Sequence, residues 1–252
     1  LSDVMMCMRD HYEGTPFSLD GDIGGGIWEM TYRPTPLSFK CEGKTCFNER
    51  PISTQQSAFV YVSQMRSWLP REIGGVMWFC NDDANMAPFT PVYCSVMSAP
   101  TCYNTPGVDG THFSVDNAFW VCNWVSNMVY PRYSQMFGSL QEVRDSLERS
   151  YQVYQQELEN VALNTYSMSK EKTMSLLTEY SHCKAQQMLD RWKKLAVYLI
   201  VKYNDMVVKP ENNGKFIMTP YGLPTAPIRP GFSDKYKKEL IKNTGDRYII
   251  AE

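Results

Sequence analysis

The sequence predicts an α+β fold in which a small sheet is followed by a pair of long helices. Short apolar runs rich in β-branched and aromatic residues occupy positions 59–62, 76–80 and 91–96. Beyond residue 138, apolar residues instead recur at intervals of three and four. The first pattern is typical of strands and the second of amphipathic helices. Sheet and helix are therefore segregated along the chain, as in α+β proteins.

Composition and charge exclude several classes of protein. The chain has 252 residues, of which 43% are hydrophobic, enough to bury a sizeable core. Its 25 basic and 27 acidic side chains give a net charge of −2, so we expect no nucleic acid partner. The longest apolar run, residues 195–201, is far shorter than the ~20 residues that span a bilayer, so no membrane partner is expected. Residues 1–10 show no signal-peptide pattern.

The first 50 residues predict little regular structure. A short helix is expected over residues 2–11, where apolar residues recur at helical spacing. The glycines at 24–26 indicate a hinge, because no Gly-Lys-Ser/Thr follows as in a phosphate-binding loop. Prolines at 34 and 36 favour irregular or edge strands, and Glu42-Gly43 predicts a hairpin turn between them and residue 47.

The central stretch, residues 53–83, predicts the core of the sheet. The runs 59–62 and 76–80 have strand character, and 91–96 can return antiparallel to the second. A helix from Asn117 to Tyr130 follows, with Asp116 as its cap and Pro131 as its end. It is apolar nearly all round, which is typical of a buried helix.

The long helices define the rest of the organisation. Ser139 to Glu142 has the pattern of a capping box, which starts an amphipathic helix reaching Val161. A break at 167–169 precedes a second helix with apolar residues from Met174 to Leu199. We therefore expect three regions: a sheet-containing core (1–135), a helical hairpin packed on it (136–206) and an irregular tail with a short helix (207–252).

The eight cysteines give only a weak signal. Cys41 and Cys46 bracket a Glu-Gly-Lys-Thr turn in which the two thiols can meet as a disulfide, and Cys80 and Cys94 can face each other across a hairpin. Neither pair has the companion Cys or His residues of a zinc site, so no metal or other cofactor is expected. A disulfide would favour a periplasmic or secreted location slightly.

No spacing in the chain reveals a catalytic nucleophile. A Gly-x-Ser-x-Gly elbow, a His-Glu-x-x-His motif and a P-loop are all absent from the sequence. Arginine can hold a carboxylate and aspartate an ammonium group, so polar residues beside the strands suit a zwitterionic ligand. A structural ion pair between Arg66 and one aspartate is the simpler interpretation from spacing alone, and a metal hydrolase using His11 and His112 is a poorer one. The candidate binding residues are Arg9, Gln55, Gln56, Arg66, Asp82 and Asp83.

Several long motifs nevertheless occur together and in order. They are Arg9-Asp-His-Tyr-Glu-Gly-Thr-Pro-Phe17, Ser53-Thr-Gln-Gln56, Gln64-Met-Arg-Ser-Trp-Leu-Pro70, Ile73-Gly-Gly-Val-Met-Trp-Phe79 and Asp82-Asp83. This set resembles the dipeptidase D family of cysteine peptidases, which belongs to the N-terminal-nucleophile hydrolases. The resemblance covers residue 1 to the start of the long helices and implies a four-layer αββα sandwich. It also implies hydrolysis of dipeptides by a cysteine at the mature N-terminus.

This chain departs from that pattern because residue 1 is Leu. We therefore expect the C-terminal part of such an enzyme, inactive alone. The partners to consider are a dipeptide, the N-terminal half of the same enzyme and a second copy in a homo-oligomer. Cys7 and Ser2 are not expected to replace the nucleophile, because both lie in a helical pattern. The alternative is a non-enzymatic module whose functional surface is the helical hairpin, residues 139–204.

Overall fold

The computed structural model describes residues 1–21, 23–35, 37–47 and 49–250 and confirms a mixed helix and sheet fold. The chain forms two compact units, each assembled from segments distant in sequence. The first unit comprises Leu1–Asp10, Ile52–Asn127 and Ser139–Ala196, and the second comprises His11–Pro51, Met128–Gly138 and Val197–Glu252.

A three-stranded antiparallel sheet forms the centre of the first unit, in the order β3-β4-β5. Its strands are β3 (Phe59–Met65), β4 (Gly75–Asn81) and β5 (Thr90–Tyr93), and the one-turn helix α2 (Arg71–Gly74) joins the first two. These are the three strands that the sequence predicts, although β5 ends three residues earlier than expected.

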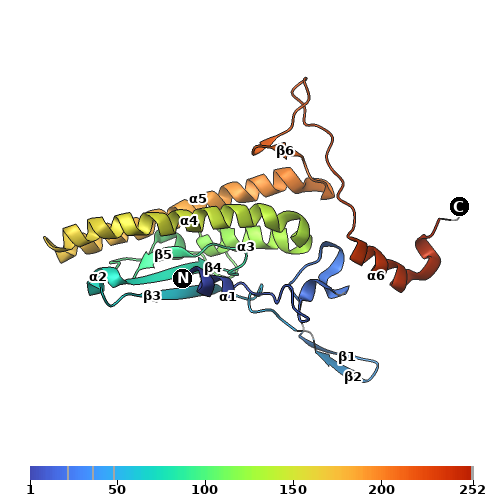
Figure 1. Cartoon of the computed structure of the whole chain (residues 1–252), viewed down its shortest axis with the longest axis horizontal. Coiled ribbons are helices and arrows are strands. Elements are labelled where there is room, and N and C mark those ends of the chain that lie inside the picture. Colours follow the sequence, from blue (N-terminus) through green and yellow to red (C-terminus); the bar gives the residue numbers. More distant parts are fainter. Residues whose placement is uncertain (22, 36, 48, 251–252) are drawn as a thin grey trace. The chain divides into compact units, whose positions relative to one another are not determined.

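Two long helices, α4 (Tyr133–Tyr166) and α5 (Lys170–Tyr203), run side by side along this sheet (Figure 1). The predicted helical hairpin and its break at 167–169 are therefore confirmed. The predicted capping box is wrong, because α4 begins at Tyr133, six residues before Ser139, and continues directly from a 3-10 turn. The shorter helices α1 (Ser2–Cys7) and α3 (Ala118–Val129) lie close to their predicted positions.

The face of the sheet toward the long helices is dry and closely packed. Val76, Trp78 and Cys80 alternate along β4 and are all fully buried, as expected for side chains on one face of a strand. Trp78 Nε1 donates to Gln64 Oε1 at 3.1 Å, and Gln155 Nε2 on α4 donates to the same oxygen at 3.1 Å. The side chains of Trp78 and Gln64 are thus hydrogen-bonded across the sheet–helix interface.

The second unit contains two small hairpins and the C-terminal helix. Strands β1 (Ser38–Cys41) and β2 (Lys44–Phe47) pair through the predicted Glu42-Gly43 turn, where both residues have positive φ. Strands β6 (Glu211–Asn212) and β7 (Lys215–Phe216) form the other hairpin, and α6 spans Asp234–Thr244.

Single 3-10 turns link the main elements of both units. They are Leu19–Gly21, Ile23–Trp28, Thr101–Tyr103, Tyr130–Arg132, Asn204–Met206 and Gly245–Tyr248. Within the described residues, no helix has both the length and the apolar character required to cross a bilayer.

Candidate functional site

The C-terminal end of β4 gathers several of the predicted site residues. Asp82 and Asp83 follow the strand directly and are both fully buried. Asp82 has a φ of 72°, so the chain turns sharply there and sends the two carboxylates to different partners. Asp82 accepts from Ser126 Oγ at 2.6 Å and from Asn123 Nδ2 at 3.0 Å, both on α3.

Burial dominates the electrostatics of Asp82. Loss of water around the carboxylate raises its pKa from 3.8 to about 7, although the hydrogen bonds from Ser126 and Asn123 oppose this rise. The folded protein therefore binds a proton at Asp82 in weakly acidic solution, where the unfolded chain does not. A neutral carboxyl group would not attract an ammonium group as the sequence-based role for Asp82 requires.

The carboxylate of Asp83 binds different segments, the one before β3 and the loop after β4. Its Oδ1 accepts from Ser53 Oγ and, at 3.1 Å, from the backbone N–H of Asn85. Ser53 is 2% exposed and also accepts from the Asn85 N–H at 3.2 Å. Asp83 thus ties the segment before β3 to the loop after β4.

Arg9 lies at the same end of the sheet but is also paired within the chain. Its guanidinium forms a two-pronged ion pair with Glu148 on α4, and its Nε donates to the carbonyl of Ala84 at 2.7 Å. Glu148 in turn accepts from the N–H of Phe89 at 2.7 Å. Arg9 therefore fastens the 84–89 loop to the helix.

The structure does not bring Arg66 together with these groups. Arg66 follows β3 and pairs with Glu159 on α4 at 2.6 Å, while Asp82 follows β4. The antiparallel pairing puts these two strand ends at opposite ends of the sheet, about 20 Å apart for strands of this length. The predicted ion pair between Arg66 and one aspartate is therefore wrong in its partner, because the structure pairs Arg66 with Glu159.

Gln55 and Gln56 lie in the loop before β3, at the same end of the sheet as Asp82. The register pairs Phe59 with Asn81, which fixes this proximity. Thr54 Oγ1 donates to Gln55 Oε1 at 3.2 Å and to Gln56 Oε1 at 2.6 Å, and Gln56 is exposed. Of the six predicted binding residues, Gln56 is exposed, Gln55, Arg9 and Arg66 are half-buried, and the two aspartates are buried.

The predicted Cys41–Cys46 disulfide is not formed, and both residues are free cysteines. The β1–β2 register pairs Cys41 with Lys44 and Cys46 with Phe39, so the two thiols are not directly opposite each other. Cys80 and Cys94 are also free. Cys94 lies opposite Gly75, at the far end of β4 from Cys80.

The buried thiols are poor nucleophiles. Burial raises the pKa of Cys80 and Cys122 well above the ordinary value and that of Cys102 to about 11. Cys80 Sγ donates to the carbonyl of Ala87 at 3.4 Å, and Cys122 Sγ contacts Met188 Sδ at 3.9 Å. In the described part of the chain, no thiol is hydrogen-bonded to an imidazole or a carboxylate that would serve as its base.

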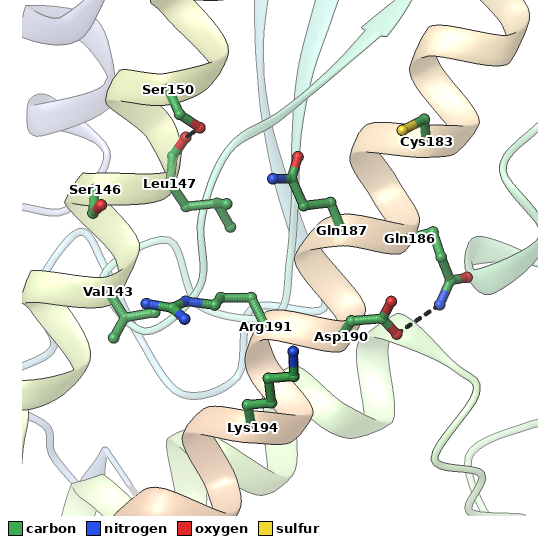
Figure 2. Close-up of a pocket in the computed structure, with 10 residues that line it drawn as sticks. All are labelled: Val143, Ser146, Leu147, Ser150, Cys183, Gln186, Gln187, Asp190, Arg191 and Lys194. Atoms are coloured by element: carbon green, nitrogen blue, oxygen red, sulfur yellow. Dashed lines mark hydrogen bonds between the residues drawn. The ribbon is translucent and has the colours of Figure 1, made fainter.

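Two surface hollows of similar size lie in the first unit. One, of about 660 Å³, separates α4 from α5, and Figure 2 shows Arg191 extending across it toward Val143, with Lys194 beside it. Its only other charged lining residue, Asp190, accepts from Gln186 Nε2 at 2.9 Å. This hollow contains none of the predicted site residues.

The other hollow, of about 630 Å³, opens on the sheet face opposite the long helices. It is lined by Phe59, Phe79 and Asn81 among others, and so reaches the end of β4 where the predicted residues gather. We therefore take this end of the sheet as the candidate site.

Sequence reasoning missed the partners that α4 supplies. Glu148, Gln155 and Glu159 look like part of a solvated helix face, yet Glu148 and Gln155 are less than 9% exposed. Together with buried Arg144 they recur at intervals of four and seven, within the apolar stripe. Polar residues on an apolar stripe were the available signal, because buried polar groups require partners.

Comparison with known proteins identifies the family. The model of peptidase family C69 matches residues 1–146, more than half of the chain. The chain belongs to peptidase family C69. The match contains all six predicted binding residues and ends within α4.

A curated relative, Dipeptidase A of Lactobacillus helveticus, is 25% identical to this C69 chain over 142 residues. The alignment covers 56% of this chain but 25% of the relative. The chain therefore spans about a quarter of the length of that protein.

Proposed function

We propose that this C69 chain is part of a cysteine dipeptidase, in which its three-stranded sheet forms one wall of the substrate site. The family match over residues 1–146 carries the proposal. Dipeptides as substrates are inferred from the name of the relative and from the polar groups at the end of β4.

The free face of the sheet supports an αββα sandwich. Phe59, Tyr61 and Met65 are 56%, 54% and 71% exposed, and all three alternate along one face of β3. Cross-strand neighbours Met77 and Phe79 extend this apolar face onto β4. Contiguous apolar surface of this kind marks an interface. We propose that a second sheet of the complete enzyme packs on the part of this face that carries Tyr61 and Met65, and that the end with Phe59 and Phe79 borders the substrate site.

The state of the cysteines supports a nucleophile outside residues 1–252. Cys80, Cys102 and Cys122 are buried with raised pKa values, and among the described residues the other five thiols make no hydrogen bond to an imidazole or a carboxylate. In an N-terminal-nucleophile enzyme the free α-amine, with a pKa of roughly 7.7–8.0, acts as general base for its own thiol. The thiolate then attacks the peptide carbonyl, and hydrogen-bond donors stabilise the resulting oxyanion.

The residues at the end of β4 would then act in two ways. Gln55 and Gln56 are proposed to face the dipeptide, because their loop lies at this end of the sheet. Arg9, Asp82 and Asp83 are proposed as positioning residues, since each is held by partners within the chain. Arg66, fixed by Glu159, would orient the opposite end of the sheet.

Hydrolysis assays test this proposal. The complete polypeptide should release free amino acids from dipeptides, and iodoacetamide should abolish the activity. Replacing its N-terminal cysteine by serine should have the same effect, while residues 1–252 alone should be inactive. Thiol-dependent hydrolysis by the pure 252-residue chain would contradict the proposal of an external nucleophile. Absence of dipeptide hydrolysis by the complete polypeptide would contradict the function itself.

A further inference from the structure

The hollow on the free face of the sheet has the properties of a small-molecule pocket. Its volume of about 630 Å³ lies within the range of about 300–1,000 Å³ that is usual for such sites. Phe59, Met77, Phe79 and Val92 of the sheet form its floor, and Phe119 of α3 contributes to its wall. No residue that lines it carries a charge, which suits an uncharged, apolar occupant.

Two polar groups in this lining lack a hydrogen-bond partner among the described residues, the amide of Asn81 and the hydroxyl of Tyr103. Asn81 is 6% exposed, and its Nδ2 makes no hydrogen bond with any described residue. A buried donor left unpaired costs about 1–3 kcal/mol. The neighbouring carboxylates of Asp82 and Asp83 have hydrogen-bond partners, whereas the amide nitrogen of Asn81 has none among the described residues. It offers a hydrogen bond to an acceptor on a bound molecule.

We propose that this pocket is a specificity subsite that receives an apolar side chain of the dipeptide, with Asn81 Nδ2 donating to the adjacent peptide carbonyl. This inference rests on the proposed dipeptidase function and adds the substrate class. Dipeptides with leucine-, methionine- or phenylalanine-like side chains are preferred, because the apolar lining gains from burying them. Charged side chains are disfavoured, since the lining has no counter-ion to offset their loss of water.

Two substitutions in the complete enzyme test the two parts of the pocket. Ala58 lines the pocket and is exposed, so Ala58→Trp fills the space from its rim with little disturbance of folding. We expect it to lower kcat/KM for Leu-Leu relative to Gly-Gly by about tenfold, since only the first substrate buries side chains there. This ratio is independent of how much enzyme is folded.

Asn81→Leu removes the donor and keeps a side chain branched at Cγ. It should lower kcat/KM about tenfold for both dipeptides, because both present the same carbonyl group. The matched control is Asn164→Leu, the same change at an exposed position on α4 outside the pocket, which should leave both values unchanged.

The outcomes separate this inference from the proposed function. If Ala58→Trp lowers kcat/KM equally for Leu-Leu and Gly-Gly, the pocket is only packing surface for the second sheet and the inference is wrong. It is equally wrong if Asn81→Leu behaves like Asn164→Leu. If the wild-type enzyme hydrolyses dipeptides but the variants give either of these two contradicting results, the proposed dipeptidase function stands and only the subsite is wrong. If it hydrolyses none, both proposals fall.

Discussion

Asp82→Asn should change how stability depends on pH. Asp82 is fully buried, and burial raises its pKa from 3.8 to about 7. Because the pKa of Asp82 is higher in the folded than in the unfolded chain, proton binding at Asp82 stabilises the fold. This stabilisation is fully present below pH 3.8 and is lost as pH rises through about 7. The difference of about three pH units, at about 1.36 kcal/mol for each, amounts to about 4 kcal/mol.

Asparagine mimics the protonated carboxyl group and can keep contacts with Ser126 and Asn123, but it does not titrate. Relative to the wild type, Asp82→Asn should therefore gain about 4 kcal/mol in the free energy of unfolding between pH 4 and pH 8. Urea unfolding of the 252-residue chain, followed by circular dichroism at several pH values, measures this difference.

Comparing the two proteins cancels the contributions of all other titrating groups. The matched control, Asp190→Asn, makes the same substitution at an exposed position and should show no such change relative to the wild type. If Asp82→Asn and the wild type keep a constant difference from pH 4 to pH 8, the carboxyl group is not protonated in the folded state and the reasoning fails.

Three further predictions follow from individual contacts. Arg66→Met should lower the free energy of unfolding by up to about 3–5 kcal/mol, because it leaves Glu159, whose side chain is 13% exposed, without its ion-pair partner. Adding Glu159→Gln should recover part of the loss, and simple additivity of the two changes would show that the pair does not couple. Gly74→Ala should lower the free energy of unfolding by about 1–3 kcal/mol, because a Cβ there would lie 2.5 Å from the carbonyl oxygen of Arg66. The control is Gly110→Ala, whose Cβ meets no atom within 4 Å and which should leave the thermal unfolding temperature unchanged. Iodoacetamide should modify the exposed thiols of the native chain and reach Cys80 only after denaturation, and mass spectrometry that found native modification of Cys80 would refute its burial.

The sequence determined the elements themselves. The continuous apolar run around Trp78 predicts β4, because short apolar runs rich in β-branched and aromatic residues are typical of buried strands. The apolar period of three and four predicts α4 and α5, and the polar break at 167–169 separates them. The Glu42-Gly43 turn was also predictable, since its backbone conformation favours glycine. Each of these signals lies within a few residues of the chain.

Only the tertiary structure decided which polar groups meet. Nothing in the sequence near Arg9 or Arg66 indicates that their partners are Glu148 and Glu159, because these pairs join residues 139 and 93 positions apart. The same holds for Asp82, whose raised pKa depends on burial beneath α3. Local pattern specifies helix and strand because backbone geometry is local, whereas burial and ion pairing depend on which surfaces the folded chain brings together. Asn81, unpaired at the edge of an apolar pocket, is distinguished from the paired Asp82 and Asp83 only at that level.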